Sequence, residues 1–142
     1  MIRAVFFDWS GTLARYVPTR EELQSQALRE LGISISPQDI APGLAIADRY
    51  LFKESAASPM RFRSPAEQAK VNIRYQQMVY TRAGVKIPDS DTFLKLMRKL
   101  AELSTRLRFV PFNDVLPAFK ALKDQNLILA LVTNMDADMS AV

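Results

Sequence analysis

The stretch that decides the fold is residues 5–13, Val-Phe-Phe-Asp-Trp-Ser-Gly-Thr-Leu. The apolar run that leads into it, residues 2–7, has the length and the β-branched and aromatic content of a buried strand. Asp8 then ends this run and begins a turn. A second apolar run, residues 127–132, reads Leu-Ile-Leu-Ala-Leu-Val and ends at Thr133. We therefore expect two buried strands, each followed at its carboxyl end by polar side chains.

The residues between these two runs have a helical pattern. Residues 19–22 form a capping-box sequence, and apolar residues follow at helical spacing as far as Gly32, which suits a helix C-terminus. A second helix is expected to begin at Ser36-Pro37, where proline is tolerated in the first turn. Pro42-Gly43 is expected to interrupt or restart this helix, because both residues disfavour helix interiors. Residues 44–55 then continue it.

Two more helices are predicted before residue 106. Residues 55–63 are expected to form a loop, and Ser64 begins a capping box whose helix ends near Ala83-Gly84. Asp89 is expected to cap a fourth helix. The buried stripe of that helix is predicted to be Phe93, Leu96, Met97, Leu100 and Leu103. Residues 19–106 are thus expected to form an all-helical block of four or five helices.

After this block the pattern returns to a helix followed by a strand. Asn113 or Asp114 is expected to cap the helix, whose apolar face is predicted to be Val115, Leu116, Phe119 and Leu122. A strand, a helical insert and a helix leading to a second buried strand predict an α/β fold. We expect a Rossmann-like parallel core, residues 1–18 and 107–142, with an inserted α-helical bundle, residues 19–106, as its cap.

The composition excludes several kinds of chemistry. The 142 residues include no Cys and no His, which excludes disulfides, thiolate nucleophiles, Ser-His-Asp triads and the usual zinc ligands. Catalysis would have to use carboxylates, hydroxyls, Lys or Arg, with a hard, oxygen-bound ion such as Mg²⁺. The net charge of +4 is spread over the predicted helices, without a basic stretch with interleaved aromatic residues. We expect a small anionic substrate and no nucleic acid as partner.

The hydropathy pattern predicts that the protein does not associate with a membrane. No apolar run approaches the roughly 18 residues that a membrane span needs. The apolar stretch at the N-terminus is too short for a signal peptide and ends in an acid. We therefore expect a cytoplasmic protein, and no feature of the sequence indicates its oligomeric state.

The two strand ends carry groups that suit an anionic substrate. Reactive groups gather at the carboxyl ends of the strands in open parallel sheets. If the two predicted strands are neighbours, Asp8 and Thr133-Asn134 meet at one edge of the sheet. The carboxylate could then attack, while the hydroxyl and nearby backbone amides hold the oxygens on which charge develops.

Both strand ends also match known signatures. Residues 5–13 resemble the first motif of the haloacid dehalogenase-like hydrolase superfamily, a hydrophobic strand followed by Asp-x-x-Gly-Thr-Leu. Residues 129–134, Leu-Ala-Leu-Val-Thr-Asn, resemble its second motif, and the helical block between them resembles the cap that many members insert. The resemblance implies that Asp8 is a nucleophile that forms a covalent aspartyl intermediate. It also implies that Thr12 supports the loop and that Thr133 hydrogen-bonds the transferred group.

The same resemblance implies a cofactor and further contacts. In magnesium-dependent members the ion is held by the nucleophile, here Asp8, by the main-chain carbonyl two residues on, here Ser10, and by a downstream acid. The backbone of Asn134 would help to orient the transferred group. Arg15 is expected in a loop that could face the substrate, and Trp9 either packs against the protein or stacks on the substrate.

Position 10 departs from the pattern of most phosphatases in this superfamily. They carry a second Asp where Ser10 stands, and a serine hydroxyl is a poor acid or base at neutral pH. Phosphonate-cleaving relatives have Ala there after the same Asp-Trp pair, dehalogenases have Tyr, and phosphorylating ion pumps have Thr. Three functions therefore stay open: Mg²⁺-dependent phosphate or phosphonate hydrolysis, 2-haloacid dehalogenation by Asp8, and a non-catalytic interaction protein of the same fold.

The remaining motifs of the superfamily are a Lys or Arg that neutralises charge and one or two acids that hold the metal. They lie downstream of the second motif, and the sequence ends at Val142. We therefore expect a truncated form of a longer hydrolase, with the remaining metal ligand downstream of Val142. The 142-residue fragment itself is expected to be inactive.

Overall fold

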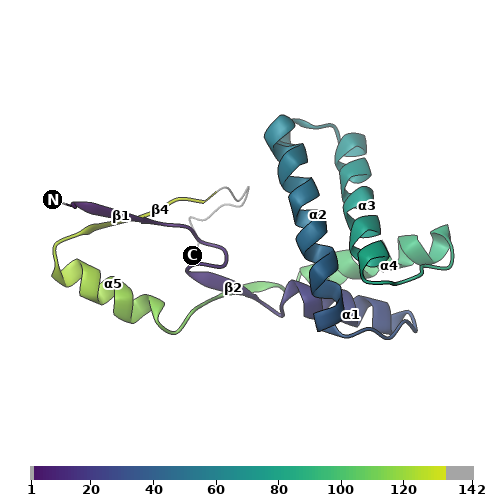
Figure 1. Cartoon of the computed structure of the whole chain (residues 1–142), viewed down its shortest axis with the longest axis horizontal. Coiled ribbons are helices and arrows are strands. Elements are labelled where there is room, and N and C mark those ends of the chain that lie inside the picture. Colours follow the sequence, from purple (N-terminus) through teal and green to yellow (C-terminus); the bar gives the residue numbers. More distant parts are fainter. Residues whose placement is uncertain (1, 134–142) are drawn as a thin grey trace. The chain divides into compact units, whose positions relative to one another are not determined.

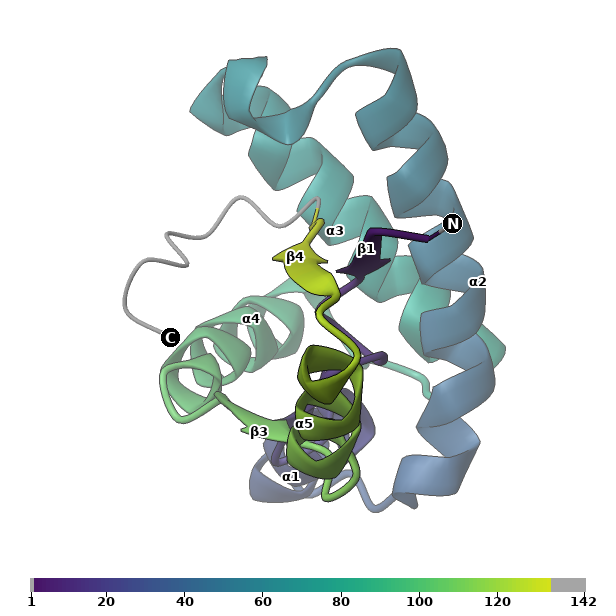
Figure 2. The same ribbon diagram turned by 90° about the vertical axis from the view of Figure 1, so that its left-hand side faces the viewer.

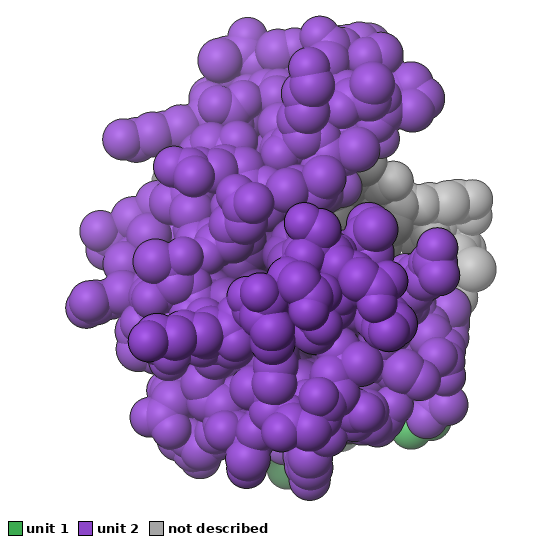
Figure 3. Space-filling model, turned by 90° about the vertical axis from the view of Figure 1, so that its right-hand side faces the viewer, with its two compact units in different colours: residues 1–19, 107–142 green, residues 20–106 purple. Residues whose placement is uncertain are grey.

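A computed structural model describes residues 2–133 of the chain (Figure 1). The chain divides into two compact units, which Figure 3 colours on a space-filling view. One, called the α/β unit below, consists of residues 1–19 and 107–142, and the other, the helical unit, consists of residues 20–106.

The helical unit is built from four α-helices and one short 3₁₀ helix. They are α1 (Arg20–Glu30), α2 (Pro37–Ala57), η1 (Met60–Phe62), α3 (Pro65–Arg82) and α4 (Ser90–Ser104). Helix α2 packs against α1 and α3, and α1 also packs against α4. The buried side chains on these faces include Leu28, Ile40, Leu44, Val79, Tyr80, Leu96 and Leu100. Their burial on all four helices forms the hydrophobic core of this unit.

The predicted helix starts at Ser36, Ser64 and Asp89 are confirmed. Each side chain accepts a hydrogen bond from the backbone N–H three residues later, as an N-cap should. At Ser64 the full capping box is present, because the Glu67 carboxylate also accepts from the Ser64 backbone N–H at 2.9 Å. The predicted loop 55–63 was partly wrong, since α2 runs on to Ala57 and η1 occupies three of the remaining residues.

The predicted interruption at Pro42-Gly43 was wrong, because α2 continues through both residues. The proline costs this helix one backbone hydrogen bond near its N-terminal end, and packing against α1 and α3 outweighs that loss. Gly43 instead permits close contact between helices. A Cβ atom at this position would lie 2.3 Å from the carbonyl oxygen of Val79 in α3.

A polar cluster joins three helices of the helical unit. The Arg20 guanidinium donates to both carboxylate oxygens of Asp48, at 2.7 and 3.2 Å, in a bidentate ion pair. The Tyr75 hydroxyl donates to Asp48 at 2.9 Å and accepts from Arg20. Because Arg20 begins α1, Asp48 lies in α2 and Tyr75 lies in α3, these bonds fix the register between the helices.

The α/β unit contains a parallel pair of strands, β1 (Ala4–Phe7) and β4 (Ile128–Leu131), which lie side by side (Figures 1 and 2). Helix α5 (Val115–Asp124) packs against β4, and Phe119 of α5 contacts Phe7 of β1 with ring centroids 5.1 Å apart. One face of this small sheet is therefore covered by α5.

Two further strands were not predicted. Strands β2 (Ala14–Val17) and β3 (Arg108–Pro111) pair in an antiparallel ladder, with Ala14 opposite Pro111 and Val17 opposite Arg108. They form a two-stranded ribbon whose strands immediately precede and follow the helical unit in the chain.

Two predictions about α5 were wrong. Asp114 stands at the N-cap position but makes no capping hydrogen bond with its side chain. Leu116, expected on the apolar face, has 75% of its surface exposed, whereas Val115 is buried. The backbone of Asp114 is helical, with φ −87° and ψ −10°, whereas a capping residue usually has an extended backbone. Leu116 is exposed because α5 packs against β4 with its other side.

The mixed α/β class is confirmed. In residues 2–133 the parallel sheet has two strands, so the Rossmann-like core stays a prediction, as does the role of the helical unit as a cap. None of the helices in this part of the chain is long and apolar enough to cross a membrane.

Candidate functional site

The loop after β1 carries the predicted nucleophile. Asp8 follows the last residue of β1, and its side chain is exposed. The loop turns sharply, because the carbonyl oxygen of Trp9 accepts hydrogen bonds from the backbone N–H groups of Leu13 and Ala14 at 2.9 and 3.0 Å. Gly11 has φ of 83°, a left-handed conformation that other residues adopt at a cost. The loop therefore holds the Asp8 carboxylate at the edge of the sheet.

The Thr12 hydroxyl points back to the nucleophile position. Its Oγ1 donates a long hydrogen bond to Oδ2 of Asp8, at 3.4 Å. A bond of this length restrains the carboxylate weakly and leaves its other oxygen available. The role of Thr12 in supporting this loop, which the resemblance implied, stays a prediction.

Thr133 follows the strand next to β1. In the parallel ladder Phe7 pairs with Leu131, and the Val132 N–H donates to the Phe7 carbonyl at 2.8 Å, which extends the pairing beyond β4. Asp8 and Thr133 therefore follow the carboxyl ends of two adjoining parallel strands. Thr133 is half-buried. Asn134 lies outside the described residues.

The same loop offers oxygen ligands that suit Mg²⁺. Among the backbone hydrogen bonds between residues 2 and 133, none ends on the carbonyl oxygen of Ser10. This oxygen and the exposed carboxylate of Asp8 are hard donors of the kind that Mg²⁺ prefers. In the same part of the chain no group of three or more acidic residues gathers, so these two residues would supply only part of a metal site.

Trp9 packs against the β2–β3 ribbon. Its ring meets Phe109 edge-on, with centroids 5.5 Å apart and an angle of 63°, and Phe109 also contacts Tyr16 at 4.4 Å. The indole Nε1 is buried and has no hydrogen-bond partner in the described chain. Of the two roles considered for Trp9, packing is therefore visible, and contact with substrate stays a prediction.

Arg15 lies in a strand and not in the loop that was expected. It is exposed on β2, opposite Val110 of β3. Arg108 was not among the residues predicted from the sequence. It is also exposed, and it lies opposite Val17. Because paired residues share a face and faces alternate along a strand, both arginines lie on one face of the ribbon. Both strands have only four residues, which is too short for the sequence alone to have indicated this pair.

Comparison with known proteins gives no family, since the chain matches no family model and no curated protein.

Proposed function

We propose that this chain carries the first part of a haloacid dehalogenase-like active site, in which Asp8 is the nucleophile of a Mg²⁺-dependent phosphate or phosphonate hydrolase acting on a small molecule. The observation that supports this most directly is the parallel pairing of β1 with β4. Asp8 and Thr133 follow the carboxyl ends of these two strands. The parallel pairing therefore brings both strand ends to the same edge of the sheet.

For a phosphate ester the chemistry would proceed in two steps. An Asp8 oxygen attacks phosphorus, the bond from phosphorus to the ester oxygen breaks, and the alcohol leaves after gaining a proton. Water then attacks the phosphorus of the aspartyl phosphate, which releases inorganic phosphate and restores the carboxylate. A bound Mg²⁺ would neutralise charge on the phosphoryl oxygens. Thr133 and Arg15 would hold those oxygens or a second anionic group of the substrate.

Ser10 limits which esters can react. The ester oxygen needs a proton as it leaves, and a serine hydroxyl is a poor source of one at neutral pH. We therefore expect a preference for substrates whose leaving group is stable as an anion.

The test uses the full-length protein with p-nitrophenyl phosphate and with acetyl phosphate. Release of phosphate should require Mg²⁺, stop with a chelator, and be lost in Asp8→Asn. The Asp8→Asn protein should keep its melting temperature within about 2 °C, because an exposed side chain contributes little to stability. Asp114→Asn, which changes another exposed acid of the same unit, is the matched control and should keep its activity.

The same assay separates the alternatives. Turnover of 2-haloacids that needs Asp8 but is indifferent to the chelator would identify a dehalogenase. If neither substrate class is turned over, the third alternative, a non-catalytic interaction protein, would be favoured. Phosphatase activity that survives Asp8→Asn would overturn the role of Asp8.

A further inference from the structure

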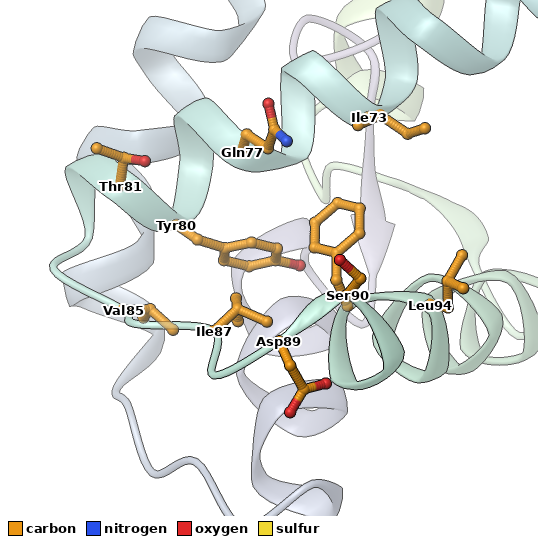
Figure 4. Close-up of a pocket in the computed structure, with 10 residues that line it drawn as sticks. Ile73, Gln77, Tyr80, Thr81, Val85, Ile87, Asp89, Ser90 and Leu94 are labelled. Atoms are coloured by element: carbon orange, nitrogen blue, oxygen red, sulfur yellow. The ribbon is translucent and has the colours of Figure 1, made fainter.

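The helical unit contains a pocket that the proposed chemistry does not use. It lies between the C-terminal half of α3, the segment that follows it and the first turn of α4, and its volume is about 600 Å³ (Figure 4). Sites for small molecules commonly have volumes of about 300–1,000 Å³. Its apolar lining is Ile73, Val85, Ile87, Phe93 and Leu94.

The base of the pocket is held in place by hydrogen bonds. Tyr80 is 2% exposed, and Figure 4 shows its ring reaching from α3 toward the start of α4. Its hydroxyl donates to Oε1 of Gln24 in α1, and Gln24 in turn donates to Gln76 at 3.0 Å. On the other side, the Asp89 carboxylate accepts from the Thr92 N–H at 2.7 Å and fixes the start of α4. The pocket is therefore formed before any ligand arrives.

The polar lining can accept a ligand. The side chains of Gln77, Thr81 and Ser90 line the pocket, and within residues 2–133 none of them has a hydrogen-bond partner. An amide and two hydroxyls offer both donors and acceptors. Apolar walls with a few available polar groups are what a small-molecule site requires.

The charges around the pocket indicate a neutral ligand. Asp89 is its one charged lining residue, and its carboxylate is already bonded to the backbone at the start of α4. An anion would find no counter-charge there, and a cation would face a carboxylate that the helix amides already stabilise. Ile73 and Leu94 remain 41% and 54% exposed at this pocket, so apolar surface is left for a ligand to cover.

We propose that this pocket binds a neutral, largely apolar small molecule that carries at least one hydrogen-bonding group. This inference does not depend on the chemistry proposed for Asp8, because every residue that carries it lies in the helical unit.

The test is binding of N-phenyl-1-naphthylamine, a neutral apolar amine whose fluorescence rises in apolar surroundings, to the full-length protein. Saturable binding is expected, with shifts of the backbone amide resonances of Val85, Ile87 and Ser90. Its sulfonated analogue, 8-anilino-1-naphthalenesulfonate, has the same rings with a negative charge. It should not displace the neutral probe at equal concentration.

Leu94 and Phe52 are both exposed, and their replacement by Glu gives a matched pair of variants. Leu94→Glu places a charge in the pocket and should weaken probe binding by at least about tenfold, or about 1.4 kcal/mol. Phe52→Glu makes a similar change on α2, where Phe52 is 65% exposed and does not line the pocket, and should leave binding unchanged. Circular dichroism checks that both variants are folded.

Several outcomes would overturn the proposal. They are the absence of saturable binding, displacement by the sulfonate, equal effects of the two variants, and resonance shifts confined to other helices. Probe binding that disappears as the protein dimerises would show that a second copy of the chain fills the pocket, and would also overturn it.

Discussion

Position 10 is the residue at which the proposed chemistry can be altered most directly. Replacing Ser10 with Asp supplies the acid and base that the sequence lacks there. Turnover of an alkyl phosphate, whose leaving group needs a proton, should rise by about a hundredfold. Turnover of p-nitrophenyl phosphate should change much less, because its leaving group is stable as an anion. The measurement is kcat for both substrates in the full-length protein.

The control for this experiment is Ser34→Asp, which adds the same charge at an exposed position of the helical unit. It should alter neither rate. An equal change for the two substrates in Ser10→Asp would mean that position 10 does not act on the leaving group.

Two buried tyrosines should make the stability of the protein fall at alkaline pH. Burial raises the pKa of Tyr75 and Tyr80 well above the ordinary value of 10.0. In the unfolded chain the two phenols would lose their protons near pH 10, while the folded chain keeps them, so unfolding is favoured as pH rises. The free energy of unfolding should be insensitive to these groups below about pH 9 and decline above about pH 10.

Urea titrations at pH 8, 10 and 11 measure this decline. In the Tyr75→Phe, Tyr80→Phe double variant the decline should be shallower, although the variant is less stable at pH 8 because Asp48 and Gln24 each lose a partner. An unchanged decline in the double variant would assign the alkaline transition to other groups.

For individual residues, the sequence predicted those roles that depend only on neighbours in the chain. The caps at Ser36, Ser64 and Asp89 were predictable because a cap bonds a backbone group only three residues away. The position of Arg15 was not, because its strand pairs with residues more than ninety positions later in the chain. Packing was one of the two roles considered for Trp9, but its partner Phe109, a hundred positions later in the chain, was not predictable.

Among the elements, the contact between α2 and α3 depends on Gly43. Gly43→Ala would gain about 1 kcal/mol of helix propensity, but its Cβ would lie 2.3 Å from the Val79 carbonyl oxygen and force the helices apart. Overpacking of this kind costs about 1–3 kcal/mol. We expect a net loss of stability of up to about 2 kcal/mol, measured by urea unfolding at pH 7.

The comparison for this variant is Ala45→Gly, an exposed position of the same helix. It should lose about 1 kcal/mol from helix propensity alone. A Gly43→Ala protein more stable than the unmodified chain would show that α2 and α3 are not held this closely.

The elements that the sequence predicted well are those with a long, periodic apolar pattern. Helix α4 has such a pattern, and its predicted residues Leu96, Leu100 and Leu103 are buried. Strands β2 and β3 have four residues each, with arginines on their exposed face, and no local pattern distinguishes them from a loop. Their pairing is a tertiary contact, which is why it required coordinates. The continuity of α2 was unpredictable for the opposite reason, because packing against α1 and α3 outweighs the local effect of Pro42.

For the whole molecule, the distribution of buried residues predicts unequal stability of the two units. Among residues 2–133, the buried hydrophobic residues of the α/β unit are Leu13, Ala14 and Val115, and the other buried hydrophobic residues lie in the helical unit. In the α/β unit, Phe6 and Ile128 remain 67% and 66% exposed. Residues 20–106 alone should therefore fold, because their core is complete without the other unit.

The measurement is thermal unfolding of residues 20–106 followed by circular dichroism, together with the dispersion of their amide resonances. A cooperative transition and well-dispersed resonances are expected. A gradual transition without dispersed resonances would show that the helical unit needs the α/β unit to fold.

The pairing of Val17 with Arg108 has a consequence for how such a chain can be rebuilt. The segment between them, residues 18–107, leaves and rejoins the ribbon at this pair. Its two ends therefore lie only one strand spacing apart, about 5 Å. A two-residue Asn-Gly turn can bridge that distance. Excising the segment at this pair and closing it with such a turn, or grafting another domain at the same place, leaves every backbone pair of β1 with β4 intact.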